Sequence, residues 1–224
     1  MNIVEYQSRD IQMKSVAAAL AEDLRTALAQ KGVVTLAVPG GTTPGPVFDA
    51  LAATDLDWSR VRVLLSDERW VPESDAQSNA ALIRERLITG AASVARFTPY
   101  YTDGIGIHDA AQDLSVALAD MLPIDVLLLG MGADMHTASL FPDGDGLSEA
   151  LAETAPMLLP MRIAGQSVAR ITLTAPVLRA ALSTHLLITG QDKRDALVAA
   201  QDLPVAQAPV QTVLSVATIH WSEQ

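Results

Sequence analysis

The sequence predicts an α/β fold: a doubly wound, mostly parallel sheet with helices on both faces, in a single domain over residues 1–224. Short, nearly uncharged apolar runs have the length of strands that are buried on both faces. Between these runs, apolar residues recur every three or four positions, as in amphipathic helices. Strands that alternate with helices in this way form parallel sheets. The chain has no internal repeat, linker-like segment or change of composition, which favours one domain.

The composition argues against several classes of protein. The net charge is −11 without any cluster of Lys and Arg, which argues against a nucleic acid or an anionic membrane surface as partner. Because the chain has no cysteine, disulfides, thiolate catalysis and Cys-ligated zinc are impossible. The first residues lack the basic and apolar regions of a signal peptide, and no apolar run approaches the roughly 18 residues that span a bilayer. We therefore expect a soluble, cytoplasmic protein. A small anionic ligand stays possible, because a few local cations are enough to bind one.

The first part of the chain predicts an edge strand over residues 2–7, followed by a long helix. From residue 10 to 31, the apolar residues that recur on one helical face are Met13, Val16, Leu20, Leu24 and Leu28. Gly32 follows, as is common at the C-terminal end of a helix. Residues 33–38 are β-branched and nearly uncharged, which predicts a buried strand.

A glycine-rich turn follows this strand, with the sequence Pro39-Gly40-Gly41-Thr42-Thr43-Pro44-Gly45. Thr43 can cap a following helix, and Pro44 suits its first position. The paired glycines let the backbone approach a ligand closely, and free N–H groups at a helix start attract an anion. The spacing matches neither a P-loop nor the dinucleotide fingerprint. An anion cradle and a plain tight turn are the two interpretations.

Charged residues follow the next predicted strand, which covers residues 60–66. Asp67 can act as an acid or base or can orient another group, and Arg69 can pair with a phosphate through its planar guanidinium. The alternative is a solvated loop with an internal Asp–Arg pair. The following segments predict a helix over about 76–88, an irregular stretch over 89–106 and a helix over 108–122.

The stretch from residue 125 to 142 predicts the reacting centre. A buried strand over 126–129 is broken by two glycines, after which Asp134 and His136 follow. Open α/β sheets bind their ligands at the carboxyl ends of strands. A histidine near an aspartate in such a turn is a candidate general base. The other three histidines fall inside predicted strands or near a helix start, so we expect structural roles for them.

Two more cations are expected near later strand ends. Arg170 begins a predicted strand over 169–174, and Lys193 follows a strand over 185–189 that is broken by Gly190. The last strand is predicted over 213–221. A base with several cations fits a sugar phosphate better than a nucleotide, because no adenine or ribose signature is present. The histidines lack metal-ligand spacing, and the acidic loop 143–146 lacks the rest of an EF-hand, so no metal site is expected.

At four segments the chain resembles the family that contains 6-phosphogluconolactonases and glucosamine-6-phosphate deaminase/isomerases. In the family's order, these segments are Pro39-Gly40-Gly41-Thr42-Thr43-Pro44; Ser66-Asp67-Glu68-Arg69-Trp70-Val71-Pro72 followed by Ser78-Asn79; Gly130-Met131-Gly132 and Asp134 to His136-Thr137-Ala138-Ser139-Leu140-Phe141-Pro142; and Arg170-Ile171-Thr172-Leu173-Thr174. Lys193 stands where the family carries a lysine. The resemblance spans most of the chain, and its third segment is highly specific.

The resemblance implies a Rossmann-like fold of the deaminase/isomerase type. It also implies hydrolysis of 6-phosphoglucono-δ-lactone to 6-phosphogluconate in the oxidative pentose phosphate pathway, without a cofactor. His136 would activate the attacking water, and Asp67 or Asp134 would orient the base or the substrate hydroxyls. The residues implied to hold the phosphate are Gly40, Gly41, Thr42, Arg170 and Lys193, with Arg69 reaching over it. The resemblance does not assign the groups that stabilise the oxyanion. It also leaves the oligomeric state undecided between a monomer and a small homo-oligomer.

Two alternative functions remain. One is a deaminase/isomerase that acts on a sugar phosphate. Enzymes of that type follow the histidine with Asn-Glu-Pro, whose carboxylate assists ring opening, whereas this chain has Leu140-Phe141-Pro142. The other is a sugar-phosphate sensor without catalysis, which would normally be fused to a further domain.

The chain departs from the family's pattern at two positions. Thr42 stands where Ser is common in the family and keeps its hydroxyl. Met135 stands where lactonases usually have Gly, so a positive φ there would cost roughly 1–2 kcal/mol, or the turn would differ.

Overall fold

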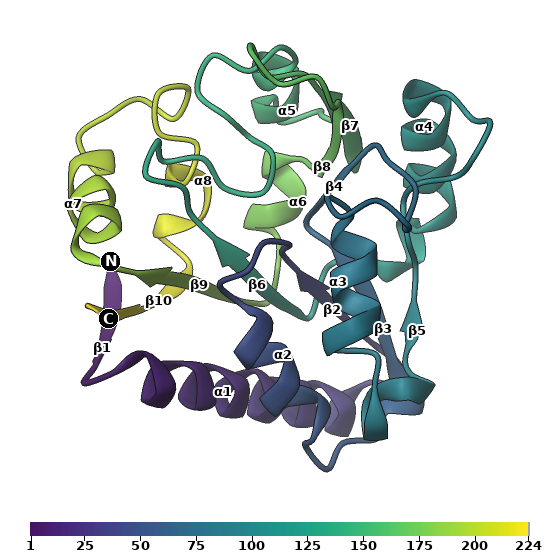
Figure 1. Ribbon diagram of the computed structural model, residues 1–224, viewed down its shortest axis with the longest axis vertical. Helices are drawn as coiled ribbons and strands as arrows, with labels where there is room; N and C mark the ends of the chain where they lie inside the picture. The colour runs from purple at the N-terminus through teal and green to yellow at the C-terminus, as the bar shows by residue number, and fades with distance from the viewer. Residues whose placement is uncertain (224) are drawn as a thin grey trace.

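The computed structural model describes residues 1–223, and its centre is a seven-stranded sheet in which every neighbouring pair is parallel (Figure 1). In spatial order the strands are β1 (Asn2–Tyr6), β10 (Ala217–Ser222), β9 (Ser183–Thr189), β6 (Val126–Gly130), β2 (Val34–Val38), β3 (Val61–Leu65) and β5 (Arg96–Phe97). All five residues of β2 are buried, as the apolar run predicts. The predicted mostly parallel α/β fold is confirmed.

The helices follow the strands along the chain. They are α1 (Arg9–Gln30), α2 (Gly45–Ala52), α3 (Asn79–Arg86), α4 (Ile107–Ala117), α5 (Leu147–Leu151), α6 (Ala175–Arg179), α7 (Gln191–Ala200) and α8 (Gln211–Leu214), with 3-10 turns at η1 (Trp58–Arg60), η2 (Gly90–Val94) and η3 (Ala119–Met121). The predicted apolar face of α1 is buried, and the Ser8 side chain caps its first turn by accepting from the Ile11 N–H at 3.3 Å. Within residues 1–223, no helix is both long and apolar enough to cross a membrane.

A second, three-stranded antiparallel sheet was not predicted. It contains β4 (Asp67–Arg69), β8 (Arg170–Leu173) and β7 (Leu158–Met161) in the order β4-β8-β7. Residues 169–174 were predicted as a strand, but this segment pairs with β4 rather than joining the parallel sheet. Ser66 joins the two sheets, because its N–H donates to Val38 O at 2.8 Å and its carbonyl accepts from the Leu173 N–H at 2.9 Å.

Several predicted boundaries were wrong for local reasons. Thr43 does not cap α2: the residue before the helix is Pro44, and no side-chain cap is formed. The helix predicted over 76–88 begins at Asn79, where Ser78 accepts from the Ala81 N–H at 3.2 Å. The strand predicted over 213–221 begins at Ala217, because Val213 and Leu214 belong to α8. A short apolar run does not distinguish a buried strand from a buried helical turn.

Candidate active site

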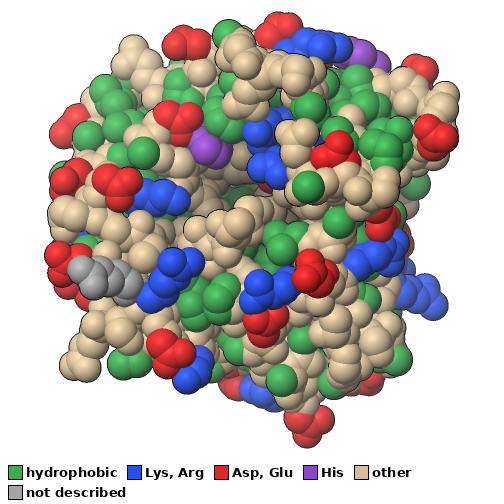
Figure 2. All heavy atoms as spheres, in the orientation of Figure 1, with side chains coloured by type: hydrophobic (Ala, Val, Ile, Leu, Met, Phe, Trp, Pro, Cys, Tyr) green, Lys and Arg blue, Asp and Glu red, His purple; other side chains and the backbone are tan. Residues whose placement is uncertain are grey.

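A cleft of about 200 Å³ opens beside the carboxyl ends of the central strands. Its lining comes from the loop after β2, from β4, from the loop after β6, from β8 and from the first turn of α7. In the space-filling view, a hollow on this face is bordered by basic side chains and by a histidine (Figure 2). Parallel sheets bring loops from distant parts of the chain together at this edge.

Most of the predicted site residues meet in this cleft. Those that line it are Gly40, Gly41, Asp67, Arg69, His136, Arg170 and Lys193. Thr42 is exposed and is not part of the lining, whereas its neighbour Thr43 is. Asp134 is not part of the lining either, but its carboxylate contacts Nδ1 of His136.

The loop that carries His136 is tightly folded on itself. The Gly132 N–H donates to His136 O and the Met135 N–H donates to Gly132 O, both at 3.0 Å. The Thr137 hydroxyl donates to Gly130 O at 2.9 Å. Met135 and Ala138 have φ angles of 66° and 48°, so both lie in the left-handed region that favours glycine. The positive φ considered for Met135 is therefore present.

Asp134 holds the imidazole of His136 by one edge. Its Oδ1 lies 2.5 Å from Nδ1 of His136 and also accepts from the His136 N–H at 3.3 Å. A carboxylate at Nδ1 favours the tautomer that is protonated there, which leaves Nε2 as an acceptor. Nε2 has no hydrogen-bond partner within residues 1–223. A Cβ on Gly132 would lie 2.2 Å from Nδ1, so the pair depends on glycine there.

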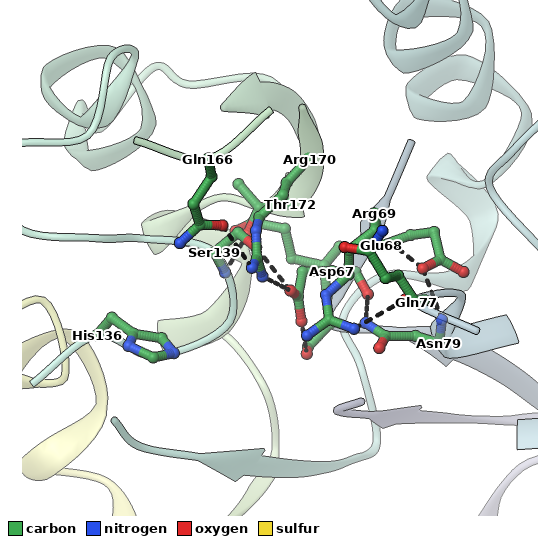
Figure 3. A network of polar contacts seen from close by, with 12 residues as sticks. Asp67, Glu68, Arg69, Gln77, Asn79, His136, Ser139, Gln166, Arg170 and Thr172 are labelled. Atoms are coloured by element: carbon green, nitrogen blue, oxygen red, sulfur yellow. Dashed lines mark hydrogen bonds and ion pairs between the residues drawn. The ribbon is translucent and has the colours of Figure 1, made fainter. Parts of the chain in front are cut away.

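Asp67 is a buried carboxylate that is not in contact with His136 (Figure 3). Its two oxygens accept from the Ser66 hydroxyl at 2.9 Å and from the Ser139 hydroxyl at 2.6 Å. Nη1 of Arg170 lies 3.8 Å from Oδ2. Of the two aspartates that the sequence offered as orienters of the base, the structure places Asp134 in contact with His136 and Asp67 beside Arg170.

Asn79 lines the cleft but was missed as a site residue, and so was the role of Glu68, which does not line the cleft but binds the Asn79 backbone. The fully buried Glu68 carboxylate accepts from the N–H groups of Arg69, Asn79 and Ala80 at 2.7–2.8 Å and from the Ser78 hydroxyl at 3.2 Å. Burial raises the pKa of Glu68, and the backbone donors oppose this shift. Asn79 donates to Asp67 O at 2.8 Å and lies so close to Gly40 that a Cβ there would be 1.8 Å from its Oδ1.

Three cationic side chains line the cleft of this acidic protein: Arg69, Arg170 and Lys193. Arg69 donates to Gln77 O and Arg170 donates to Oε1 of Gln166, each at 2.8 Å. Within residues 1–223, the Nε atoms of both arginines are buried without a partner. Burial lowers the pKa of Arg170. Unpaired donors and a net positive lining are suited to an anionic ligand.

Comparisons with known proteins agree with these features. A family model described as glucosamine-6-phosphate isomerases/6-phosphogluconolactonase matches residues 7–221. A 6-phosphogluconolactonase of Pseudomonas aeruginosa is 44% identical over 94% of this chain and 90% of its own, and one of Mesorhizobium japonicum is 42% identical over 91% and 86%. The crystal structure of a 6-phosphogluconolactonase from Shewanella baltica superposes with a TM-score of 0.95 at 29% identity, covering 99% of this chain and 97% of that chain.

Proposed function

This chain belongs to the glucosamine-6-phosphate isomerase/6-phosphogluconolactonase family. We propose that it hydrolyses a sugar-phosphate lactone, with His136 as the general base. The reaction opens 6-phospho-D-glucono-1,5-lactone to 6-phospho-D-gluconate, a step of the oxidative pentose phosphate pathway. The observation that supports this base is the 2.5 Å contact between Asp134 and Nδ1 of His136 at the cleft. This contact favours the tautomer with its proton on Nδ1, so the basic lone pair lies on Nε2, the ring nitrogen that does not contact Asp134. The proposal includes the cytoplasmic location expected from the sequence.

In the proposed mechanism, Nε2 takes a proton from a water molecule as its oxygen attacks the lactone carbonyl carbon. The tetrahedral intermediate collapses with cleavage of the bond between this carbon and the ring oxygen. The imidazolium returns its proton to the ring oxygen, which leaves as a hydroxyl group. Asp134 keeps the imidazole in the required tautomer and stabilises the positive charge that it carries between these steps.

The phosphate of the substrate would supply the binding energy that places the lactone over His136. Its proposed ligands are the backbone of Gly40 and Gly41 and the side chains of Arg170 and Lys193, with Arg69 beside them. Thr42 belongs to the same proposed turn, although Thr43 is the threonine that lines the cleft. Contacts to this remote group can position the reacting carbonyl without touching it. Asp67 would act indirectly, because it lies beside Arg170 and binds Ser139.

Neither alternative function gains support from the cleft. Ring opening by a deaminase needs a further carboxylate near the histidine, but the next acidic residue, Asp143, is exposed and does not line the cleft. A catalytically silent sensor would not need the paired Asp134 and His136. Hydrolysis of the lactone therefore agrees best with the residues at the site.

The direct test is the hydrolysis of freshly generated 6-phosphogluconolactone in a pH-stat. We expect the protein to accelerate ring opening above the uncatalysed rate, and His136→Ala to lower kcat by about 100-fold or more, because a general base contributes that much. The variant should still bind 6-phosphogluconate, since the phosphate ligands remain. If both proteins match the uncatalysed rate but bind the product, the sensor interpretation is correct. Release of ammonia from glucosamine 6-phosphate would support the deaminase.

A further inference from the structure

The aromatic ring of Phe141 contacts two groups of the proposed active site. It stacks on the imidazole of His136, with ring centroids 3.9 Å apart and planes inclined by 18°. The guanidinium carbon of Arg170 lies 5.2 Å from the Phe141 centroid. Phe141 is itself only 7% exposed. It therefore packs against both the proposed base and one of the proposed phosphate ligands.

The loop fixes the position of this ring. Ala138 turns the chain through its positive φ of 48°, and the Leu140 N–H closes the turn on Thr137 O at 3.0 Å. Ser139 is anchored at two points, to Oδ2 of Asp67 at 2.6 Å and to Oγ1 of Thr172 at 3.1 Å. The Phe141 carbonyl accepts from the Gly144 N–H at 3.0 Å. The backbone on both sides of Phe141 is therefore held by hydrogen bonds, and the buried ring extends from it against the imidazole.

The hydrogen bond that Nδ1 of His136 donates to Asp134 restrains only one edge of the imidazole. The imidazole could still tilt about this edge, and Nε2 on the opposite side would move most. A ring stacked against the imidazole face opposes this tilt. The face of an aromatic ring also carries partial negative charge, which attracts the cation formed when the imidazole takes a proton.

We propose that Phe141 is a positioning residue that fixes the plane of the His136 ring and stabilises its protonated form during lactone hydrolysis. The inference rests on the proposed role of His136 as general base. It assigns no contact with the substrate to Phe141. Arg170 is also held by Gln166 Oε1 at 2.8 Å and lies 3.8 Å from Asp67, so its position does not depend on Phe141 alone. The effect of Phe141 should therefore be mainly on kcat and on the pH profile, with little change in KM.

The test compares Phe141→Leu, which removes the aromatic ring, with Phe141→Tyr, which keeps it. For Phe141→Leu we expect kcat to fall about threefold to tenfold with KM within about twofold, as for the loss of one aromatic stacking interaction. The acidic limb of the kcat/KM profile should move by about 0.5 pH unit to lower pH, because the protonated imidazole loses a favourable contact. Phe141→Tyr should keep most of kcat and leave the limb in place.

A matched control is Phe97→Leu. Phe97 also carries an arginine, Arg84, 5.2 Å from its ring centroid, but it lies on the edge strand β5 and does not line the cleft. This variant loses the same type of contact and should leave kcat and the pH profile unchanged. Circular dichroism and binding of 6-phosphogluconate would verify that each variant is folded.

Nuclear magnetic resonance of ¹³C-histidine-labelled protein tests the stacked geometry without relying on activity. The His136 ring protons, assigned with His136→Ala, should be shifted upfield by the Phe141 ring and should lose this shift in Phe141→Leu but not in Phe97→Leu. If the leucine and tyrosine variants lose kcat equally, or if the acidic limb does not move, the positioning role is overturned. If the unchanged protein does not accelerate hydrolysis while the upfield shift is present, the proposed function fails and the stacking itself is retained.

Discussion

At the scale of single residues, the proposed base stands in a loop with unusual backbone angles. Met135 and Ala138, on either side of His136, adopt φ angles of 66° and 48° that cost a non-glycine residue roughly 1–2 kcal/mol. Such angles persist only where surrounding contacts enforce them, and they are common at functional sites. Here two contacts hold the loop. The Val210 N–H donates to Met135 O at 3.0 Å, and the hydroxyl of Ser139, which follows Ala138, donates to Asp67.

Replacement of Met135 by glycine and by alanine should separate this backbone cost from the side-chain packing. Both substitutions remove the same partly buried side chain, but only glycine adopts the positive φ freely. We expect Met135→Gly to be about 0.5–1 kcal/mol more stable than Met135→Ala after the greater flexibility of unfolded glycine is included. Urea unfolding followed by circular dichroism measures the difference. Equal stabilities would mean that the left-handed angle carries no cost here.

Spacing in the sequence predicted the pair of Asp134 and His136, because the two residues belong to one short loop. It left open whether Asp67 or Asp134 contacts the base, since both follow predicted strands. The roles of Ser139 and Asn79 had no sequence signal of this kind. Ser139 bonds to a carboxylate 72 positions away, and Asn79 bonds to a carbonyl 12 positions away through a turn that spacing does not specify.

At the scale of elements, the long helix and the buried parallel strands were predictable, whereas the small sheet was not. The strand β4 has only three residues, all charged, so it lacks the alternation that indicates a strand. The strand β7 contains Pro160, which weakens any strand prediction. The segment over 169–174 has a strand pattern, but a pattern does not indicate which sheet a strand joins.

The Glu68 carboxylate connects the small sheet to the start of α3, so its replacement tests this element. In Glu68→Gln, one acceptor oxygen becomes an NH₂ group that faces backbone donors from Asn79, Ala80 or Arg69. We expect a loss of about 2–3 kcal/mol in the free energy of unfolding, because a buried group is left unsatisfied.

The matched control is Glu73→Gln, which removes the surface pair with Arg84 and should cost no more than about 1 kcal/mol. Urea unfolding at neutral pH compares the two variants. Equal losses would show that Glu68 does not hold the N-terminal end of α3.

At the scale of the whole molecule, an aromatic hydrogen-bonded chain ties the edge of the sheet together, and it is separate from the cleft. The Tyr6 hydroxyl lies 2.7 Å from Nδ1 of His220, whose Nε2 lies 2.9 Å from Nδ1 of His185, and Nε2 of His185 lies 2.8 Å from Asp23. The chain joins β1, β10, β9 and α1. Sequence patterns placed His185 and His220 within strands, but the pairing of these strands, and so the contact, depended on a strand order that patterns do not give.

The hydrogen-bonded row of Tyr6, His220, His185 and Asp23 should make the stability of the protein depend on pH. Burial, followed by the charge of His185, lowers the pKa of His220 from 6.5 to about 4. Between these values the unfolded chain binds a proton at this position that the folded protein does not bind. The free energy of unfolding should therefore fall as the pH falls from 6.5 toward 4, by roughly 3 kcal/mol in total from this group.

Urea unfolding at pH 7 and pH 5 should show a smaller loss for His220→Gln, which cannot titrate, than for the unchanged protein. His108→Gln, at an exposed histidine, is the control and should keep the original pH dependence. An identical loss in all three proteins would mean that His220 titrates in the folded state as it does in the unfolded chain.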